Sequence, residues 1–554
     1  MDRIIRILNS IKSKLRNDYA LSSFLVFIFI FALLSFMYIP NRGIIAIDDH
    51  FFHFKIAENI KENGFESLRD FDNIYLTRTA SDGDKYAVSL FNLSLVPFTY
   101  ISDPILALKI SDVFWLSLSL AFLFIALRKL KIKHPFLWIL LLLSVNFFVM
   151  RMLIGRAFVM SIPFFLFEIY FAVNRRWRSF LLLSFLHVFW HQSSFFVPLL
   201  VASVVEVARY LHSYTFFWKN LLASILAAVA AMLYFPELAK GLLSVQLAAN
   251  DNERFNIEGI ELKVHDIFDI YGTERIAFLL LILSISFALF IYIRMKKDKF
   301  TDQSYAKNNI IFLFAFSISS LLFLFGTISV SGRFYDFYFP SVIFFSAIAL
   351  SIAFDSGIIT CSSYFRKYFL IAISIFLTFG VVNNLLLRNQ IISNNDYRPI
   401  GEAAQWVSNR SDGSQKIFLH TWNHFPVSFF YNDKDIYTMG IEPIALYDYN
   451  EDLYWKWYNI FVHNIYCDIP IDCIEQKNNF DKKLMAIDEK DREKAVSENY
   501  RKMINSIKND FGAKYIIGLN GMGQMAESNM DMVSEMSKFE SEYNGSIIYA
   551  IELK

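Results

Sequence analysis

The sequence predicts an α-helical polytopic membrane protein with a C-terminal α/β domain outside the membrane. Apolar residues make up 55% of the 554 residues, and Phe occurs 60 times. About eleven apolar stretches, each close to the roughly 20 residues that cross a bilayer, interrupt the chain before residue 388. From residue 388 the sequence becomes polar and charged, and it is long enough for one domain. We therefore expect a transmembrane domain at 1–387 and an extracytoplasmic domain at 388–554.

The first apolar run, 19–39, follows a basic N-terminal segment. It is too long for the apolar core of a signal peptide and has no small-residue cleavage site, so we expect a retained helix. The later expected crossings are 111–127, 135–150, 157–173, 179–190, 194–211, 217–235, 276–293, 308–327, 338–354 and 368–387.

Lysine and arginine occur in every second gap between these runs, at 128–133, 175–178, 219, 294–307 and 366–367. Basic residues favour cytoplasmic loops. We therefore predict a multi-pass protein of the cell membrane with a cytoplasmic N-terminus, an external first loop at 40–110 and an external C-terminal domain. The apolar stretch 86–101, interrupted by Asn92 and Pro97, is expected to be interfacial or re-entrant, because a crossing there would turn the later basic loops outward.

The C-terminal segment mixes helical and strand patterns. We expect helices at 402–409 and 481–508, and strands at 416–420, 513–519 and 546–553. Cys467 and Cys473 lie in one short loop of this domain, and an oxidising exterior would allow a disulfide between them. Two unpaired thiols are the alternative. The net charge of +1 gives no indication of nucleic-acid binding.

The first external loop carries two acids and two histidines directly after a membrane segment. Asp48, Asp49, His50, His53 and Lys55 lie within eight residues, and 53–62 has the pattern of a short helix along the membrane surface. Ionisable groups beside lipid are costly and mark a site. An acid there can deprotonate an acceptor or hold a divalent cation (Mg or Mn), while the histidines and the lysine can bind a substrate. The alternative is that these residues have no catalytic role and are only the polar end of an interfacial segment.

This stretch, from Asp48 to Ile60, resembles the first-loop motif of GT-C membrane glycosyltransferases. It is most similar to the version in oligosaccharyltransferase catalytic subunits, where an acid precedes aromatics, a His and a basic residue. The order of an external first loop, many crossings and an external α/β domain also matches. The resemblance implies that Asp48 and Asp49 are catalytic or metal-binding, and that the donor is a polyprenyl-phosphate-linked sugar.

Two further stretches are similar to the family. Arg333 and Tyr335 lie in a segment that enters a crossing from outside, where an Arg-Phe element of the family contacts the lipid phosphate. Arginine can hold a phosphate bidentately, although snorkelling to the interface is the alternative. Trp422 and His424 stand where the family carries its acceptor motif. The second Trp and the Asp of that motif are absent here, which argues against recognition of a peptide sequon.

The second external loop departs from the family. It contains Arg151 and Arg156 and lacks the acidic metal-binding motif, so metal dependence stays open. The two arginines either bind phosphate or anchor lipid headgroups. His187 and His191 end an apolar run, where they either line the same cavity or, as is more common for a histidine at a helix end, are satisfied interfacial residues. Glu168 lies inside a run and is expected to be a packed polar residue.

We therefore predict a glycosyltransferase that moves a sugar from a polyprenyl-phosphate donor to a glycan, lipid or protein acceptor. An oligosaccharyltransferase that moves a whole glycan onto protein is the second prediction. A lipid-sugar flippase or transporter is the alternative from another class, although the charged residues collect at external ends rather than at the midplane. The sequence has no nucleotide-binding glycine motif and no nucleophile elbow.

Overall fold

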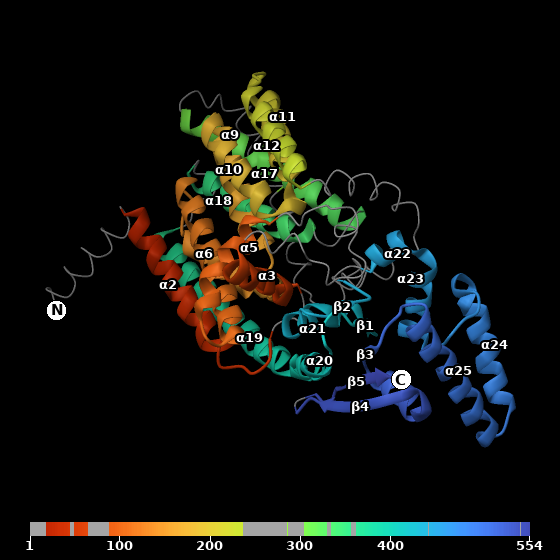
Figure 1. Ribbon diagram of the computed structural model, residues 1–554. Helices are drawn as coiled ribbons and strands as arrows, with labels where there is room; N and C mark the ends of the chain where they lie inside the picture. The colour runs from red at the N-terminus through yellow and green to blue at the C-terminus, as the bar shows by residue number, and fades with distance from the viewer. Residues whose placement is uncertain are drawn as a thin grey trace, which may run out of the picture. The chain divides into compact units, whose positions relative to one another are not determined.

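The computed structural model describes residues 18–44, 49–64, 88–235, 285, 304–329, 334–355, 362–440, 443–542 and 544–554. The contacts divide the chain into two compact units. The helical unit comprises residues 1–40, 89–91 and 109–389, and the C-terminal unit comprises residues 41–88, 92–108 and 390–554. Figure 1 shows the helices and strands of both.

The helical unit consists of apolar helices that match the expected runs. Five are long and apolar enough to cross a membrane: Tyr19–Tyr38, Pro104–Lys129, Gln192–Ser213, Asn308–Thr327 and Tyr335–Phe354. The expected run 276–293 lies outside the described residues apart from Ile285, and each of the others falls on a helix. The helices are α2 (Tyr19–Tyr38), α6 (Pro104–Lys129), α7 (Pro135–Ser144), α8 (Asn146–Leu153), α9 (Phe158–Val173), α10 (Trp177–Trp190), α11 (Val197–Ser213), α12 (Lys219–Tyr234), α17 (Ser304–Ser329), α18 (Tyr335–Asp355) and α19 (Ser363–Asn394).

Several helices are shorter than the runs suggested. The run 135–150 is divided between α7 and α8, because Val145 is extended between them. The α9 and α12 helices are apolar but have 16 residues each. At about 1.5 Å per residue such a helix spans about 24 Å, less than the roughly 30 Å of a hydrocarbon core. The structure therefore supports several candidate crossings, and the count of eleven stays a prediction.

Aromatic side chains fill the core of the helical unit. Within it, α9, α10, α11, α12 and α17 lie side by side (Figure 1). Phe165 of α9 is fully buried and its ring meets Phe323 of α17 at 5.4 Å and Phe337 of α18 at 5.8 Å. Such edge-on ring pairs add about 0.5–1.5 kcal/mol beyond the area that they bury. This core ties α9, α17 and α18 together.

The C-terminal unit contains a five-stranded sheet in the order β2-β1-β3-β5-β4. Strands β2, β1 and β3 are parallel, and β5 is antiparallel to both β3 and β4. The expected α/β domain is therefore confirmed at the level of a small sheet with helices. The strands are β1 (Lys416–Leu419), β2 (Ile436–Tyr437), β3 (Tyr515–Gly518), β4 (Val533–Glu540) and β5 (Ile547–Leu553).

Two of these strands were not expected from the sequence. Strand β2 has two residues, too few for a pattern. Strand β4 is at the edge of the sheet and exposes charged residues, so it has little of the apolar alternation that identifies strands. The helices of this unit are α20 (Arg398–Arg410), α21 (Phe425–Tyr431), α22 (Ile444–Tyr449), α23 (Glu451–Tyr458), α24 (Cys473–Ala486), α25 (Glu489–Asn509) and α26 (Asn520–Glu527). The expected helix 481–508 is interrupted at Asp488, whose side chain caps α25 by accepting from Asp491 N.

Most of the expected first loop, residues 41–88 and 92–108, belongs to the C-terminal unit. Its helix α3 (His50–Asn63) and the 3-10 turn η2 (Val96–Tyr100) contact each other there. The backbone of Gly43 lies against that of Ile392, where a Cβ would fall 1.8 Å from the Ile392 carbonyl oxygen. Only glycine permits this approach. The C-terminal unit thus contains residues 390–554 together with this earlier segment, which the predicted division at residue 388 did not include.

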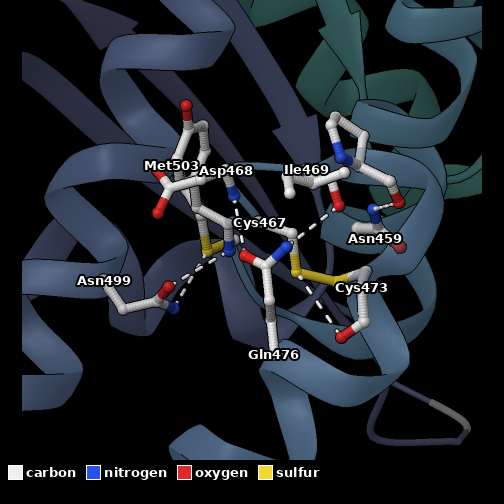
Figure 2. Close-up of a disulfide and its surroundings, with 10 residues drawn as sticks. Asn459, Cys467, Asp468, Ile469, Cys473, Gln476, Asn499 and Met503 are labelled. Carbon is white, nitrogen blue, oxygen red and sulfur yellow. Dashed lines mark hydrogen bonds between the residues drawn. A yellow bond between two sulfur atoms is a disulfide. The ribbon is translucent and has the colours of Figure 1, made fainter.

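The two cysteines of the C-terminal unit form the expected disulfide, shown in Figure 2. Their Cα atoms are 5.5 Å apart, within the usual range for a disulfide. The Asn459 side-chain amide donates to the Pro470 carbonyl at 2.7 Å, and the Gln476 amide accepts from Asp468 N at 2.9 Å and donates to the Ile469 carbonyl at 3.1 Å. Side chains that precede and follow the Cys467–Cys473 loop thus hold it in place by hydrogen bonds.

Candidate functional site

Helix α3 carries the acid-aromatic-histidine stretch and is fixed to the C-terminal unit by its phenylalanines. Phe51 and Phe54 are fully buried, and the Phe51 ring meets Phe430 of α21 at 5.4 Å. Phe52 meets Phe429 of the same helix at 5.6 Å. The aromatic residues of the motif are therefore packing residues. They hold its polar residues against the segment that follows β1.

The polar residues of α3 lie at its start. Asp49 is the N-terminal flanking residue, and its side chain makes no capping hydrogen bond to the helix. His53 follows four residues later, so Asp49 and His53 share one face. Asp49 and His53 are partly exposed, whereas His50 is buried. An acid and an imidazole on one face can together accept and pass a proton.

Lys55 points to carboxylates of its own unit. Its ammonium lies 3.1 Å from an Asp433 oxygen and 3.6 Å from a Glu58 oxygen. Burial raises the pKa of the Glu58 carboxyl, while Lys55 opposes that rise. Because two acids neutralise this lysine, its main contribution is to join α3 to the stretch after α21. We had expected Lys55 to face a substrate.

The segment after β1 carries two buried histidines. His424 was expected at the site and His420 was not; both are over nine-tenths buried. Burial lowers the pKa of His420 to about 4 and that of His424 to about 3. Both rings are therefore neutral near pH 7 and cannot compensate a phosphate charge. Trp422, on the turn between them, is half-buried.

In the helical unit, Arg151 forms a bidentate pair with Asp336. The guanidinium donates to the two carboxylate oxygens at 3.1 and 2.8 Å, and the side chains are 14% and 5% exposed. The sequence of the second loop contains no acid, yet the fold brings one from the start of α18. Arg156 is partly exposed, and Tyr335 is buried with its ring stacked on Phe339.

Further polar residues of the helical unit lie between α9 and α10. His191 Nδ1 is 2.9 Å from the Ser161 hydroxyl, and His187 Nδ1 is 3.1 Å from a Glu168 oxygen. Glu168 and His187 are fully buried. The sequence placed Glu168 in the packed interior, but its pairing with His187 follows only from the antiparallel arrangement of the two helices.

Two of the predicted site residues, Asp48 and Arg333, lie outside the described residues. Within the described part of the chain, no group of three or more His, Cys, Asp or Glu side chains is arranged to hold a metal ion. Of the two acids expected to hold Mg or Mn, Asp49 is described and Asp48 is not.

The structure brings together some of the predicted residues in each unit. Asp49, His50, His53, Lys55, Trp422 and His424 belong to the C-terminal unit, and Arg151, Arg156, His191 and Tyr335 belong to the helical unit. Asp336 and Asp433, the partners of Arg151 and Lys55, were missed, because nothing in sequence spacing links positions so far apart. No protein-family model matches the chain, and no curated protein matches it significantly.

Proposed function

We propose that this protein is an integral membrane glycosyltransferase of the GT-C type that uses a polyprenyl-phosphate-linked sugar at the extracytoplasmic face. One observation carries the proposal. Helix α3, with its acid and histidines, is packed by ring contacts onto α21, directly after the segment that carries Trp422 and His424. The expected catalytic stretch and the expected acceptor stretch thus belong to one compact unit, although more than 350 residues separate them in the sequence.

The proposed reaction is a displacement at the anomeric carbon of the donor. Asp48 or Asp49 removes the proton of an acceptor hydroxyl, and the hydroxyl oxygen attacks the anomeric carbon. The bond from this carbon to the phosphate oxygen breaks, and the phosphate keeps the electron pair. Arg333 is proposed to stabilise that charge, with Arg156 as a further candidate. Arg151 could join them only if Asp336 released it. A divalent cation at the acids would supply further neutralisation.

The placement of the first loop supports the proposed topology. Residues 49–64 and 390–554 form one unit, so both must lie on the same side of any membrane that the chain crosses. An even number of crossings is then required between them. The ten crossings expected from 111 to 387 satisfy this condition, whereas a crossing at 86–101 would not. The helices there, Leu90–Leu95 and Val96–Tyr100, are also too short to cross.

The test is transfer of labelled sugar by the purified full-length protein from a panel of polyprenyl-phosphate sugars. We expect one donor to be consumed with formation of a glycosidic bond, and we expect Asp49→Asn or Asp48→Asn to abolish turnover while donor binding remains. A general base contributes about 10²–10⁴-fold. Near-normal rates in both single variants and in the double variant would refute the proposal. Transfer of a whole glycan onto a peptide would identify an oligosaccharyltransferase instead.

A lipid-sugar flippase is the second candidate, and one observation favours it. Glu168 and His187 form a fully buried ionisable pair in the helical unit, as transporters have inside the membrane. The same donor panel in sealed vesicles separates the two functions. Movement of intact lipid-linked sugar between leaflets, without release of polyprenyl phosphate, would favour the flippase.

A further inference from the structure

Three polar contacts follow one side of α9 in the helical unit. They occur at Ser161, at Glu168 and at the carbonyl groups of Ala172 and Val173. Steps of seven and four residues return to the same side of an α-helix, so these positions form a line about 16 Å long. Polar groups between apolar helices are costly when lipid is the surrounding medium. Such a line calls for a function or a structural role at each contact.

The contact at the start of α9 is the one nearest to solvent. The His191 ring nitrogen Nδ1 lies 2.9 Å from the Ser161 hydroxyl and 2.5 Å from the Ser194 hydroxyl. His191 is partly exposed. It follows His187 by four residues, so the two imidazoles come from adjacent turns of the chain at the end of α10.

The middle contact is an ionisable pair without access to water. His187 Nδ1 lies 3.1 Å from Glu168 Oε1, and both side chains are 0% exposed. The Ser184 hydroxyl, one turn before His187, interacts electrostatically with the same carboxyl but forms no hydrogen bond within the described part of the chain. Within the described part of the chain, the second ring nitrogen of His187, Nε2, has no hydrogen-bond partner. A buried pair of this kind is often less stable than apolar residues of similar size, so a stabilising role explains it poorly.

The third contact has a structural role. Arg209 of α11 pairs with Glu206 and donates to the carbonyls of Ala172 and Val173 at 2.7 and 3.2 Å. Asn220 of α12 donates to Glu206 at 3.0 Å and to Ala172 at 3.2 Å. These bonds satisfy the last carbonyl groups of α9, which a helix end leaves without intrahelical partners. This network is the last polar contact along this side of α9, at the C-terminal end of the helix.

We propose that Glu168 and His187 form an intramembrane proton-binding site. Burial favours the state of zero net charge, in which the carboxyl group and the imidazole together hold two protons. Release of one proton leaves a single negative charge on the pair, and uptake restores neutrality. Imidazole can accept a proton at one nitrogen and donate from the other, and His191 provides the next acceptor toward solvent. The site is independent of the proposed sugar transfer.

The neighbouring helices bring few other charges to this pair. On α11, Glu206 and Arg209 neutralise each other one turn beyond Glu168. On α18, the start of the helix carries Asp336, which Arg151 neutralises. From α17 the contacts to α9 are rings, with Phe323 against Phe165 and Phe312 against Tyr170. From α12 the contact is the Asn220 amide. On α6, the Lys129 ammonium lies 5.7 Å from the ring centre of Tyr170 of α9. His191, four residues after His187, is the next histidine along the chain.

Infrared difference spectroscopy of the full-length protein in lipid nanodiscs tests the proposal. We expect acidification to produce the absorption of a protonated, buried carboxyl group in the wild type and Glu168→Gln to abolish it. His187→Asn should keep the band and change its frequency, because it removes the imidazole nitrogen that lies 3.1 Å from the carboxyl oxygen. Glu206→Gln is the matched control and should leave the band unchanged.

Two results would overturn the site. One is a wild-type spectrum without any titrating buried carboxyl, and the other is a band that survives in Glu168→Gln. If Glu168→Gln does not fold, Ser184→Ala serves in its place, because it keeps both ionisable groups and removes only the hydroxyl beside the carboxyl. A shift of band frequency in Ser184→Ala supports the assignment to Glu168, and an unchanged spectrum contradicts it.

Discussion

The pair between Arg151 and Asp336 allows a direct test of whether Arg151 is a structural residue or a donor-binding one. Both partners are well placed by their own helices. Arg151 lies in the last turn of α8 and Asp336 in the first turn of α18, where the helix dipoles favour a cation and an anion respectively. The Arg151 guanidinium also lies 5.2 Å from the Phe158 ring centre. The pair is thus held by geometry as well as charge.

The perturbation is Asp336→Ala, compared with Arg151→Ala and with the double variant Arg151→Met/Asp336→Leu. Breaking a buried pair from one side costs about 3–5 kcal/mol, because the remaining charge is left uncompensated. That cost raises the unfolding equilibrium constant roughly 150- to 5,000-fold. Replacing both partners with apolar residues should be nearly neutral. We therefore expect both single variants to be strongly destabilised and the double variant to be close to wild type.

Denaturant unfolding in detergent, followed by tryptophan fluorescence, measures the stability of each variant. A loss below about 1 kcal/mol in Asp336→Ala, the range of an exposed ion pair, would refute the reasoning. Donor kinetics of the double variant then separate the two roles. Normal donor use in a stable double variant makes Arg151 a structural residue, whereas loss of donor use at unchanged stability makes it part of the phosphate site.

Three further predictions concern the C-terminal unit. Because burial lowers the pKa values of His420 and His424 from about 6.5 to about 4 and 3, the unfolded chain binds more protons below pH 6.5. Denaturant unfolding should therefore show stability falling as pH decreases, by up to about 1.4 kcal/mol per pH unit for each histidine, and a flat profile would contradict their burial. Phe54→Ala should lower the free energy of unfolding by about 3–5 kcal/mol and speed the exchange of backbone amide hydrogens in residues 50–63. Unchanged exchange in these residues would exclude the packing of α3 on α21. Replacing both Cys467 and Cys473 with serine should lower the free energy of unfolding by about 2 kcal/mol, because the unfolded chain is no longer restricted by a closed loop. Equal denaturant midpoints for the wild type and this variant would count against the disulfide.

The sequence predicts local features of this fold well because they depend on neighbours in the chain. Apolar run length located the apolar helices, and strand-like patterns located β1, β3 and β5. The edge strand β4 was missed because its exposed positions carry charges instead of a repeating apolar pattern. The break at Val145 was missed because an extended residue within an apolar run has no side-chain signal.

The sequence identified individual candidate residues for the site, but it did not predict which side chains these residues contact. The motif put Asp49, His53 and Lys55 in one short stretch of sequence. It could not show that Phe51 contacts α21 or that Asp433 pairs with Lys55. These contacts join positions hundreds of residues apart. They depend on how the chain returns after its last membrane helix, which composition does not encode.

The packing of α3 on α21 has a consequence for biosynthesis. The ribosome releases residues 50–63 early, but their partners at 425–431 emerge only after all the apolar helices of the helical unit. Until α21 has been made, Phe51 and Phe54 lack their native packing partners. A chaperone or the lipid surface must shield these rings from water during that time. For the same reason, a fragment that begins at residue 390 would expose the α21 rings to water and should aggregate, whereas supplying residues 41–64 in trans should keep it soluble.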